Sequence, residues 1–222
     1  MKATTTPRVK VCCISSIEEA WIAINSGASA LGFVSNMPSG PGVISEELIT
    51  EITAKIPPPI ATFLLTSYQE TEAIIEQLRR CRCNTVQICD RLLSGSYQDI
   101  RTALTNVSIV QVIHVTDERS VEEAIKIAPQ VDALLLDSGN QSLAIKKLGG
   151  TGRIHDWKLS NQIRELVNVP IFLAGGLKPE NVALAVEIVA PFGLDLCSGV
   201  RSQGKLDEAK LQEFFKQLKV LS

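Results

Sequence analysis

The sequence contains little of what several common protein classes require. It has only two histidines, His114 and His155, and its six cysteines form no C-x-x-C pair. Few sets of zinc ligands are therefore available, and no metal is expected. The 22 lysines and arginines do not outnumber the 24 acidic residues, so the net charge is -2. Without a basic excess to neutralise phosphates, a nucleic-acid partner is not expected either.

Long apolar stretches are also missing. Runs such as residues 133–136 are far too short to span a bilayer. The first ten residues contain no apolar core of a signal peptide. We therefore expect a cytoplasmic protein with no membrane partner. In such a reducing compartment most of the cysteines are expected to be free buried thiols, because free cysteine behaves as a small hydrophobic residue.

What the sequence does contain is a regular alternation of strand and helix patterns. Hydrophobic residues make up 45% of the 222 residues, and no linker divides the chain, which predicts a single domain over residues 1–222. Short β-branched and apolar runs predict strands at residues 9–14, 30–35, 60–66, 85–90, 109–115, 133–138, 170–174 and 193–197. Helical periodicity fills the segments between them, at residues 69–81, 97–105, 120–128, 158–167, 179–190 and 207–218. Two more helices are expected after Ser16 and Ser45, each read as the start of a capping box.

These strands are apolar on both faces, which is typical of parallel sheets covered by helices. Eight units in 222 residues leave about 28 residues for each, which is the unit length of a small (β/α)8 TIM barrel. The fold class is therefore α/β, with a single TIM barrel as the expected architecture. A doubly wound open sheet is the alternative, but the segment Cys12-Cys13-Ile-Ser-Ser after the first strand is no nucleotide-binding fingerprint.

Glycine-rich turns follow the last three predicted strands. Glycine lets backbone amides approach an anion, and the loops after strands 7 and 8 are the usual phosphate site of such barrels. Plain turn formation is the alternative, yet three such turns together favour phosphate binding. The residues expected to bind it are Gly150, Gly152, Gly175, Gly176, Ser198 and Gly199.

An ordered set of motifs extends this pattern over nearly the whole chain. From Lys10 to about Phe214 the sequence resembles phosphoribosylanthranilate isomerase, an enzyme of tryptophan biosynthesis. The matching pieces are Val9-Lys-Val-Cys-Cys-Ile, Gly27-Ala-Ser-Ala-Leu-Gly-Phe-Val34, Leu136-Asp-Ser138, Gly149-Gly-Thr-Gly152, His155-Asp-Trp157, Leu173-Ala-Gly-Gly-Leu177, Pro179-Glu-Asn-Val182 and Leu194-Asp-Leu-Cys-Ser-Gly-Val200.

The resemblance implies an Amadori rearrangement of a phosphorylated sugar, without cofactor or metal. By that resemblance Cys12 takes the general-base position and Asp137 the general-acid position, a pairing that suits a reaction needing one protonated and one deprotonated group. Lys10 shares a strand face with Cys12 and could favour its thiolate, while Val11 and Cys13 are expected to face the helices. The residues alone also allow Cys12 as core packing and Asp137 as a turn residue. Asp195 is expected either to contact substrate or to pair with a barrel lysine.

The sequence departs from the family's pattern at several positions, and one of these departures concerns the aromatic end of the substrate. Cys13 replaces a glycine, residues 89 and 90 replace a His-Gly pair, and the loop at residues 37–45 lacks the arginine that grips the anthranilate carboxylate. Arg201, Arg153 or Arg91 could supply that contact instead, and we expect Arg201, which directly follows the last glycine turn. The alternatives are an isomerase of another phosphorylated aminosugar or a non-catalytic barrel that binds a phosphorylated ligand. No pattern in the sequence indicates an oligomeric state.

Overall fold

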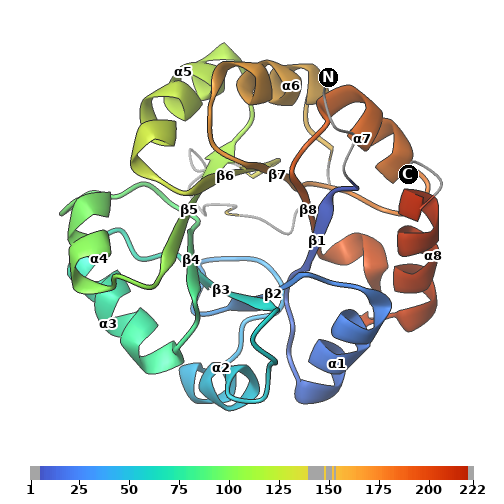
Figure 1. Ribbon diagram of the computed structural model, residues 1–222, viewed down its shortest axis with the longest axis horizontal. Helices are drawn as coiled ribbons and strands as arrows, with labels where there is room; N and C mark the ends of the chain where they lie inside the picture. The colour runs from blue at the N-terminus through green and yellow to red at the C-terminus, as the bar shows by residue number, and fades with distance from the viewer. Residues whose placement is uncertain (1–5, 140–147, 149–151, 153, 220–222) are drawn as a thin grey trace.

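The computed structural model, which describes residues 6–139, 148, 152 and 154–219, is a closed barrel of eight parallel strands ringed by helices (Figure 1). The strands are β1 (Arg8–Val11), β2 (Ala30–Val34), β3 (Ala61–Thr66), β4 (Thr85–Ile88), β5 (Ser108–His114), β6 (Ala133–Asp137), β7 (Ile171–Leu173) and β8 (Gly193–Leu196). The helices are α1 (Ile17–Ser26), α2 (Glu46–Thr53), α3 (Thr71–Cys81), α4 (Tyr97–Ala103), α5 (Glu118–Ile127), α6 (Trp157–Leu166), α7 (Val182–Val189) and α8 (Glu208–Lys219).

Strand order follows the chain, and the barrel closes where β1 pairs in parallel with β8. The closing register runs from Arg8 opposite Gly193 to Val11 opposite Leu196. The (β/α)8 barrel that the sequence predicts is therefore confirmed. A short antiparallel hairpin, β9 (Arg201–Ser202) with β10 (Lys205–Leu206), precedes α8 and has no counterpart among the predicted elements.

The two helix starts predicted at Ser16 and Ser45 are in the right place, but neither is the capping box expected there. Ser16 accepts a hydrogen bond from the Glu19 amide, and Ser45 from the Leu48 amide, so both serines cap their helices. Neither forms a complete capping box, because the Glu19 carboxylate bonds the Ser15 amide instead and Leu48 carries no acceptor. Reciprocal boxes occur at the starts of α4 and α5.

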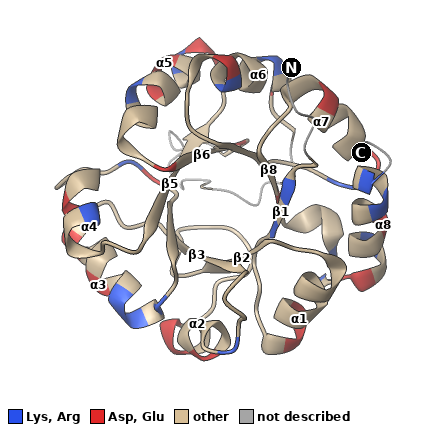
Figure 2. Ribbon diagram, in the orientation of Figure 1, with Lys and Arg blue, Asp and Glu red and all other residues tan. Residues whose placement is uncertain are grey.

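Apolar side chains fill both sides of the strands. One cluster packs between the barrel and its helices, and a second fills the barrel interior. Phe63, Phe172 and Phe192 stack edge to face near the amino ends of their strands, with ring centroids 5.8 and 5.6 Å apart. Charged residues lie mainly on the outer helices (Figure 2). Within the described part of the chain, no helix has the length and apolar character needed to cross a membrane.

Candidate active site

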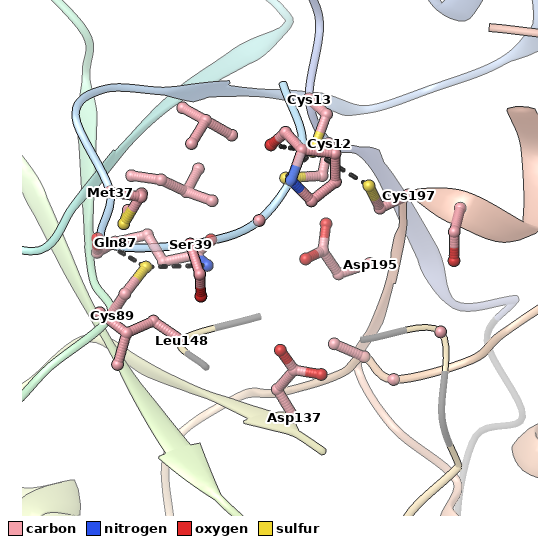
Figure 3. A pocket seen from close by; sticks show the side chains of 18 of the residues that line it. Cys12, Cys13, Met37, Ser39, Gln87, Cys89, Asp137, Leu148, Asp195 and Cys197 are labelled. Atoms are coloured by element: carbon pink, nitrogen blue, oxygen red, sulfur yellow. Dashed lines mark hydrogen bonds between the residues drawn. The ribbon is translucent and has the colours of Figure 1, made fainter. Parts of the chain in front are cut away.

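A cavity lies at the barrel mouth, where the carboxyl ends of the strands meet (Figure 3). Most of the residues predicted for the site line it: Cys12, Asp137, Gly152, Gly175, Gly176, Asp195 and Ser198. Gly150 lies outside the described residues. Gly199 packs instead against the Leu177 backbone. A Cβ at position 199 would lie 1.9 Å from the Leu177 carbonyl oxygen, so only glycine fits there.

Cys12 is held directly after β1 by its amide, which donates to the Leu196 carbonyl of β8 at 2.7 Å. Its thiol shares a space with the Lys10 ammonium group. A Cβ added at Gly32 of β2 would lie 3.0 Å from both Cys12 Sγ and Lys10 Nζ. The missing side chain at Gly32 therefore makes room for both groups, a role that the sequence analysis did not recognise. The alternation of residues 30, 32 and 34 along β2 is the signal that could have revealed it.

Lys10 is fully buried and donates to the Asp195 carboxylate at 2.7 Å. Burial alone would lower the pKa of Lys10, but the negative charges of Asp195 and Cys12 raise it well above its ordinary value. The ammonium group therefore stays charged close to the Cys12 thiol. Of the two roles expected for Asp195, the structure shows the ion pair with a barrel lysine.

Asp137 ends β6 on the other side of the cavity from Cys12, with Asp195 between them (Figure 3). Its carboxyl group is buried and accepts a hydrogen bond from the Ser138 amide at 2.7 Å. Burial raises the pKa of Asp137 above its ordinary value, and the negative charge of Asp195 adds to the rise. A carboxyl group in this environment retains its proton to higher pH, as a general acid requires.

The glycine turns form one wall of the cavity. Gly152, Gly175 and Gly176 have φ angles of 65°, 83° and 64°, a left-handed backbone that other residues rarely adopt. A Cβ at Gly152 would lie 3.4 Å from the Ser198 hydroxyl, so the turns after β6 and β8 adjoin. Adjoining turns of this kind can aim several backbone amides at one anion.

Two orientations at this end of the barrel correct the sequence analysis. Cys13 does not face the helices: it lines the cavity with Cys12, because β1 ends at Val11 and Cys13 has a left-handed φ of 62°. Alternation along a strand therefore no longer applies to it. Arg201 was expected to meet a carboxylate of the substrate. Its buried guanidinium instead pairs with Glu19 at 2.9 Å and donates to the Cys12 and Cys13 carbonyls.

The other two candidate cations give no replacement among the described residues. Arg91 pairs with Glu123 at 3.0 Å and borders a separate hollow beside α4 and α5. Arg153 lies outside the described residues. The described lining of the mouth cavity includes no arginine or lysine, and its wall beyond Cys12 is built from Met37, Pro41 and Leu148. This wall can pack against an apolar or aromatic group.

A barrel with a thiol, a buried carboxyl group and glycine turns at one mouth has the arrangement of an enzyme acting on a small phosphorylated molecule. The model of the N-(5'-phosphoribosyl)anthranilate (PRA) isomerase family matches residues 9–217. The chain therefore belongs to the PRA isomerase family.

Individual relatives agree with this assignment. The N-(5'-phosphoribosyl)anthranilate isomerase of Methanocella arvoryzae is 31% identical over 214 residues, which cover 96% of this chain and 98% of the relative. The crystal structure of phosphoribosyl anthranilate isomerase from Thermotoga maritima is 30% identical, with a TM-score of 0.79 and coverage of 96% and 99%. A phosphoribosyl anthranilate isomerase in complex with reduced 1-(o-carboxyphenylamino)-1-deoxyribulose 5-phosphate is 29% identical, with a TM-score of 0.76 and the same coverage.

Proposed function

We propose that the protein converts N-(5-phosphoribosyl)anthranilate to 1-(2-carboxyphenylamino)-1-deoxyribulose 5-phosphate, an aldose-ketose isomerisation of tryptophan biosynthesis. The observation that carries this proposal is the placement of Cys12 and Asp137 on opposite sides of one cavity, with the glycine turns forming its wall. The reaction needs an acid and a base on opposite sides of one sugar. Family membership supports the same conclusion.

The proton transfers follow from the two environments. Asp137, whose pKa is raised mainly by burial, protonates the furanose ring oxygen, and the ring opens to an iminium ion. Cys12, beside the Lys10 ammonium group, removes the C2 proton and leaves an enolamine. The enolamine then tautomerises to the aminoketose. Lys10 acts as a positioning residue, because its ammonium group lies close to the Cys12 thiol and is held there by Asp195.

Binding is divided along the cavity. The amides near Gly152, Gly175, Gly176 and Ser198 hold the substrate phosphate. The wall of Met37, Pro41 and Leu148 receives the aromatic ring. Because the described lining offers no cation to the anthranilate carboxylate, a second candidate is an isomerase of another phosphorylated aminosugar.

The test is turnover of purified protein, with rescue of a tryptophan auxotroph that lacks this isomerase step. Cys12→Ala and Asp137→Asn should each lower kcat by about 10²- to 10⁴-fold, the usual loss when a general acid or base is removed. Cys81→Ala is the control, because this buried thiol does not line the cavity.

Three results would change the assignment. Equal activity on an aniline analogue that lacks the carboxylate would favour the second candidate. Full activity in both cavity variants would contradict the acid-base assignment, and no turnover by the unmodified protein on either compound would leave a phosphate-binding barrel.

A further inference from the structure

Three thiols meet at the mouth of the cavity, and only one of them has a part in the proposed chemistry. Cys13 Sγ lies 3.0 Å from Cys197 Sγ and 3.9 Å from Cys12 Sγ. All three side chains line the cavity, and Cys197 is partly exposed, so a small molecule entering the cavity can reach them (Figure 3). The remaining question is what the pair formed by Cys13 and Cys197 can do.

The backbone brings this pair together from opposite ends of the sequence. β1 and β8 are neighbouring parallel strands, and the Cys12 amide still bonds the Leu196 carbonyl just past the end of the ladder. The register that pairs Val11 with Leu196 therefore brings Cys13 and Cys197 close together just past the ends of the two strands. The left-handed φ of Cys13 turns its side chain into the cavity, toward Cys197.

We infer that Cys13 and Cys197 are a redox-reactive pair that forms a reversible disulfide beside the catalytic thiol when the cavity admits a peroxide. The sulfurs need to approach from 3.0 Å to the bonded distance of about 2.05 Å, a movement of the size of a side-chain adjustment. Disulfides in reducing compartments are usually transient and redox-sensing, which fits a pair held as free thiols.

The local charges identify which sulfur reacts first. The hydrogen bond with Cys13 lowers the pKa of Cys197, and the nearby positive charge of Arg201 acts in the same direction against burial. Hydrogen bonds to its two neighbouring thiols, and then burial, raise the pKa of Cys13. Cys197 is therefore the thiolate that attacks, and Cys13 is the thiol that resolves the product.

The oxidation proceeds in two balanced steps. Cys197 thiolate attacks one oxygen of hydrogen peroxide, the O–O bond breaks, and hydroxide leaves as the cysteine becomes a sulfenic acid. The Cys13 sulfur then attacks the sulfenic sulfur, a disulfide bond forms, and the hydroxyl group leaves as water with the Cys13 proton. Two thiols and one peroxide thus give one disulfide and two waters. A dithiol reductant reverses the reaction by exchange.

The disulfide also affects the neighbouring site, a consequence that rests on the proposed function. It draws Cys13 away from Cys12 and ties the end of β1 to the turn that carries Ser198. Isomerase activity should therefore fall on oxidation and return on reduction. The disulfide itself depends only on the two sulfurs, so its formation can be tested whether or not the protein is an isomerase.

The first experiment measures the disulfide directly in the full-length protein. Cys12→Ser removes the catalytic thiol and leaves five cysteines, and a small excess of hydrogen peroxide should consume two of the remaining thiols. Alkylation and mass spectrometry should locate a Cys13–Cys197 bond, absent from the further variants Cys13→Ser and Cys197→Ser. Cys83→Ser, in a buried thiol outside the cavity, is the matched control and should still form the disulfide.

The second experiment follows turnover of the unmodified protein. At least a tenfold loss of activity with peroxide, recovered with dithiothreitol in step with the disulfide, is the expected result. Retention of all five thiols in the Cys12→Ser variant, or bonding of another pair, would overturn the inference. A Cys13–Cys197 disulfide that forms and leaves turnover unchanged would overturn the regulatory part, whereas absence of turnover in reduced protein would concern the proposed function alone.

Discussion

At the scale of single residues, the site depends on two buried carboxyl groups that have different partners. Asp195 is paired with the buried Lys10 ammonium at 2.7 Å and serves as a fixed negative charge. Asp137 is held by the Ser138 amide, and its pKa is raised by burial and then by Asp195. Burial raises the pKa of Asp195 as well, but Asp195 has a hydrogen-bonded ammonium group, Lys10, to oppose that rise, so Asp137 is the carboxyl group better suited to hold a proton.

The raised pKa of Asp137 lowers the stability of the folded protein near neutral pH, and a substitution should reveal this effect. Because its pKa is raised on folding, the folded protein binds the proton more tightly than the unfolded chain. The stability contributed by this group is thus full below the unfolded pKa near 4 and is lost as the pH rises through the folded value. Asp137→Asn has no charge to bury, and its amide oxygen can still accept from Ser138.

The variant should gain stability relative to the unmodified protein as the pH rises from 4 toward neutrality. Urea unfolding at several pH values measures this difference, with Asp99→Asn at an exposed capping position as the comparison. A constant difference between Asp137→Asn and the unmodified protein across this range would mean that Asp137 titrates normally. Loss of turnover alongside a gain in stability is the combination expected of a strained catalytic group.

At the scale of elements, the strands and helices could be predicted because their hydrophobic periods differ, but their ends could not. The strand predicted at residues 9–14 ends at Val11, since the left-handed Cys13 leaves the ladder. The strand predicted at 170–174 shrinks to Ile171–Leu173, between a proline and a glycine turn. The hairpin of β9 and β10 was missed because strands of two residues carry no period.

That hairpin is anchored by contacts far apart in the sequence. The buried Glu19 carboxylate accepts from Arg201 and from the Leu206 amide, joining the first turn of α1 to β9 and β10. Arg201 also donates to the Cys12 and Cys13 carbonyls, so it fixes the backbone behind the thiols. Arg201 therefore has a structural position, and no composition or spacing rule could have identified its partner 182 residues away.

Arg201→Ala should lower the free energy of unfolding by about 3–5 kcal/mol, because it leaves the Glu19 charge buried and unpaired. Thermal or urea unfolding measures the loss. Arg119→Ala is the matched control: this arginine pairs with Asp117 at the surface, so little change is expected. The double variant Glu19→Gln/Arg201→Ala should recover part of the stability. An unchanged midpoint in Arg201→Ala, with a raised KM for the carboxylated substrate only, would restore the role first expected for this residue.

At the scale of the whole molecule, the two ends of the barrel have different roles: one end carries the cavity and the other stabilises the barrel. The residues of the site that lie at strand ends could be predicted from the sequence. Cys12, Asp137 and the glycine turns all lie at or just after the carboxyl ends of strands, and in a parallel barrel these ends meet at one mouth. The ion pair of Lys10 with Asp195 could be anticipated only as one of two alternatives. The inward turn of Cys13 and the space at Gly32 depend on three-dimensional packing, so they became visible only in the structure.

The end of the barrel opposite the cavity should affect the stability of the protein and not its activity. The substitution Gly193→Ala, at the start of β8, tests this expectation. At the closing seam between β1 and β8, a Cβ at Gly193 would lie 2.5 Å from the Phe172 ring and 3.3 Å from the Arg8 carbonyl. Overpacking of this kind costs about 1–3 kcal/mol, which should lower the Tm by roughly 2–10 °C. Adding Phe172→Leu should restore part of the loss by making room. Because the cavity lies at the other mouth, kcat and KM at 25 °C should stay within about twofold. A large fall in kcat without a fall in Tm would show that the seam shapes the active site as well as closing the barrel.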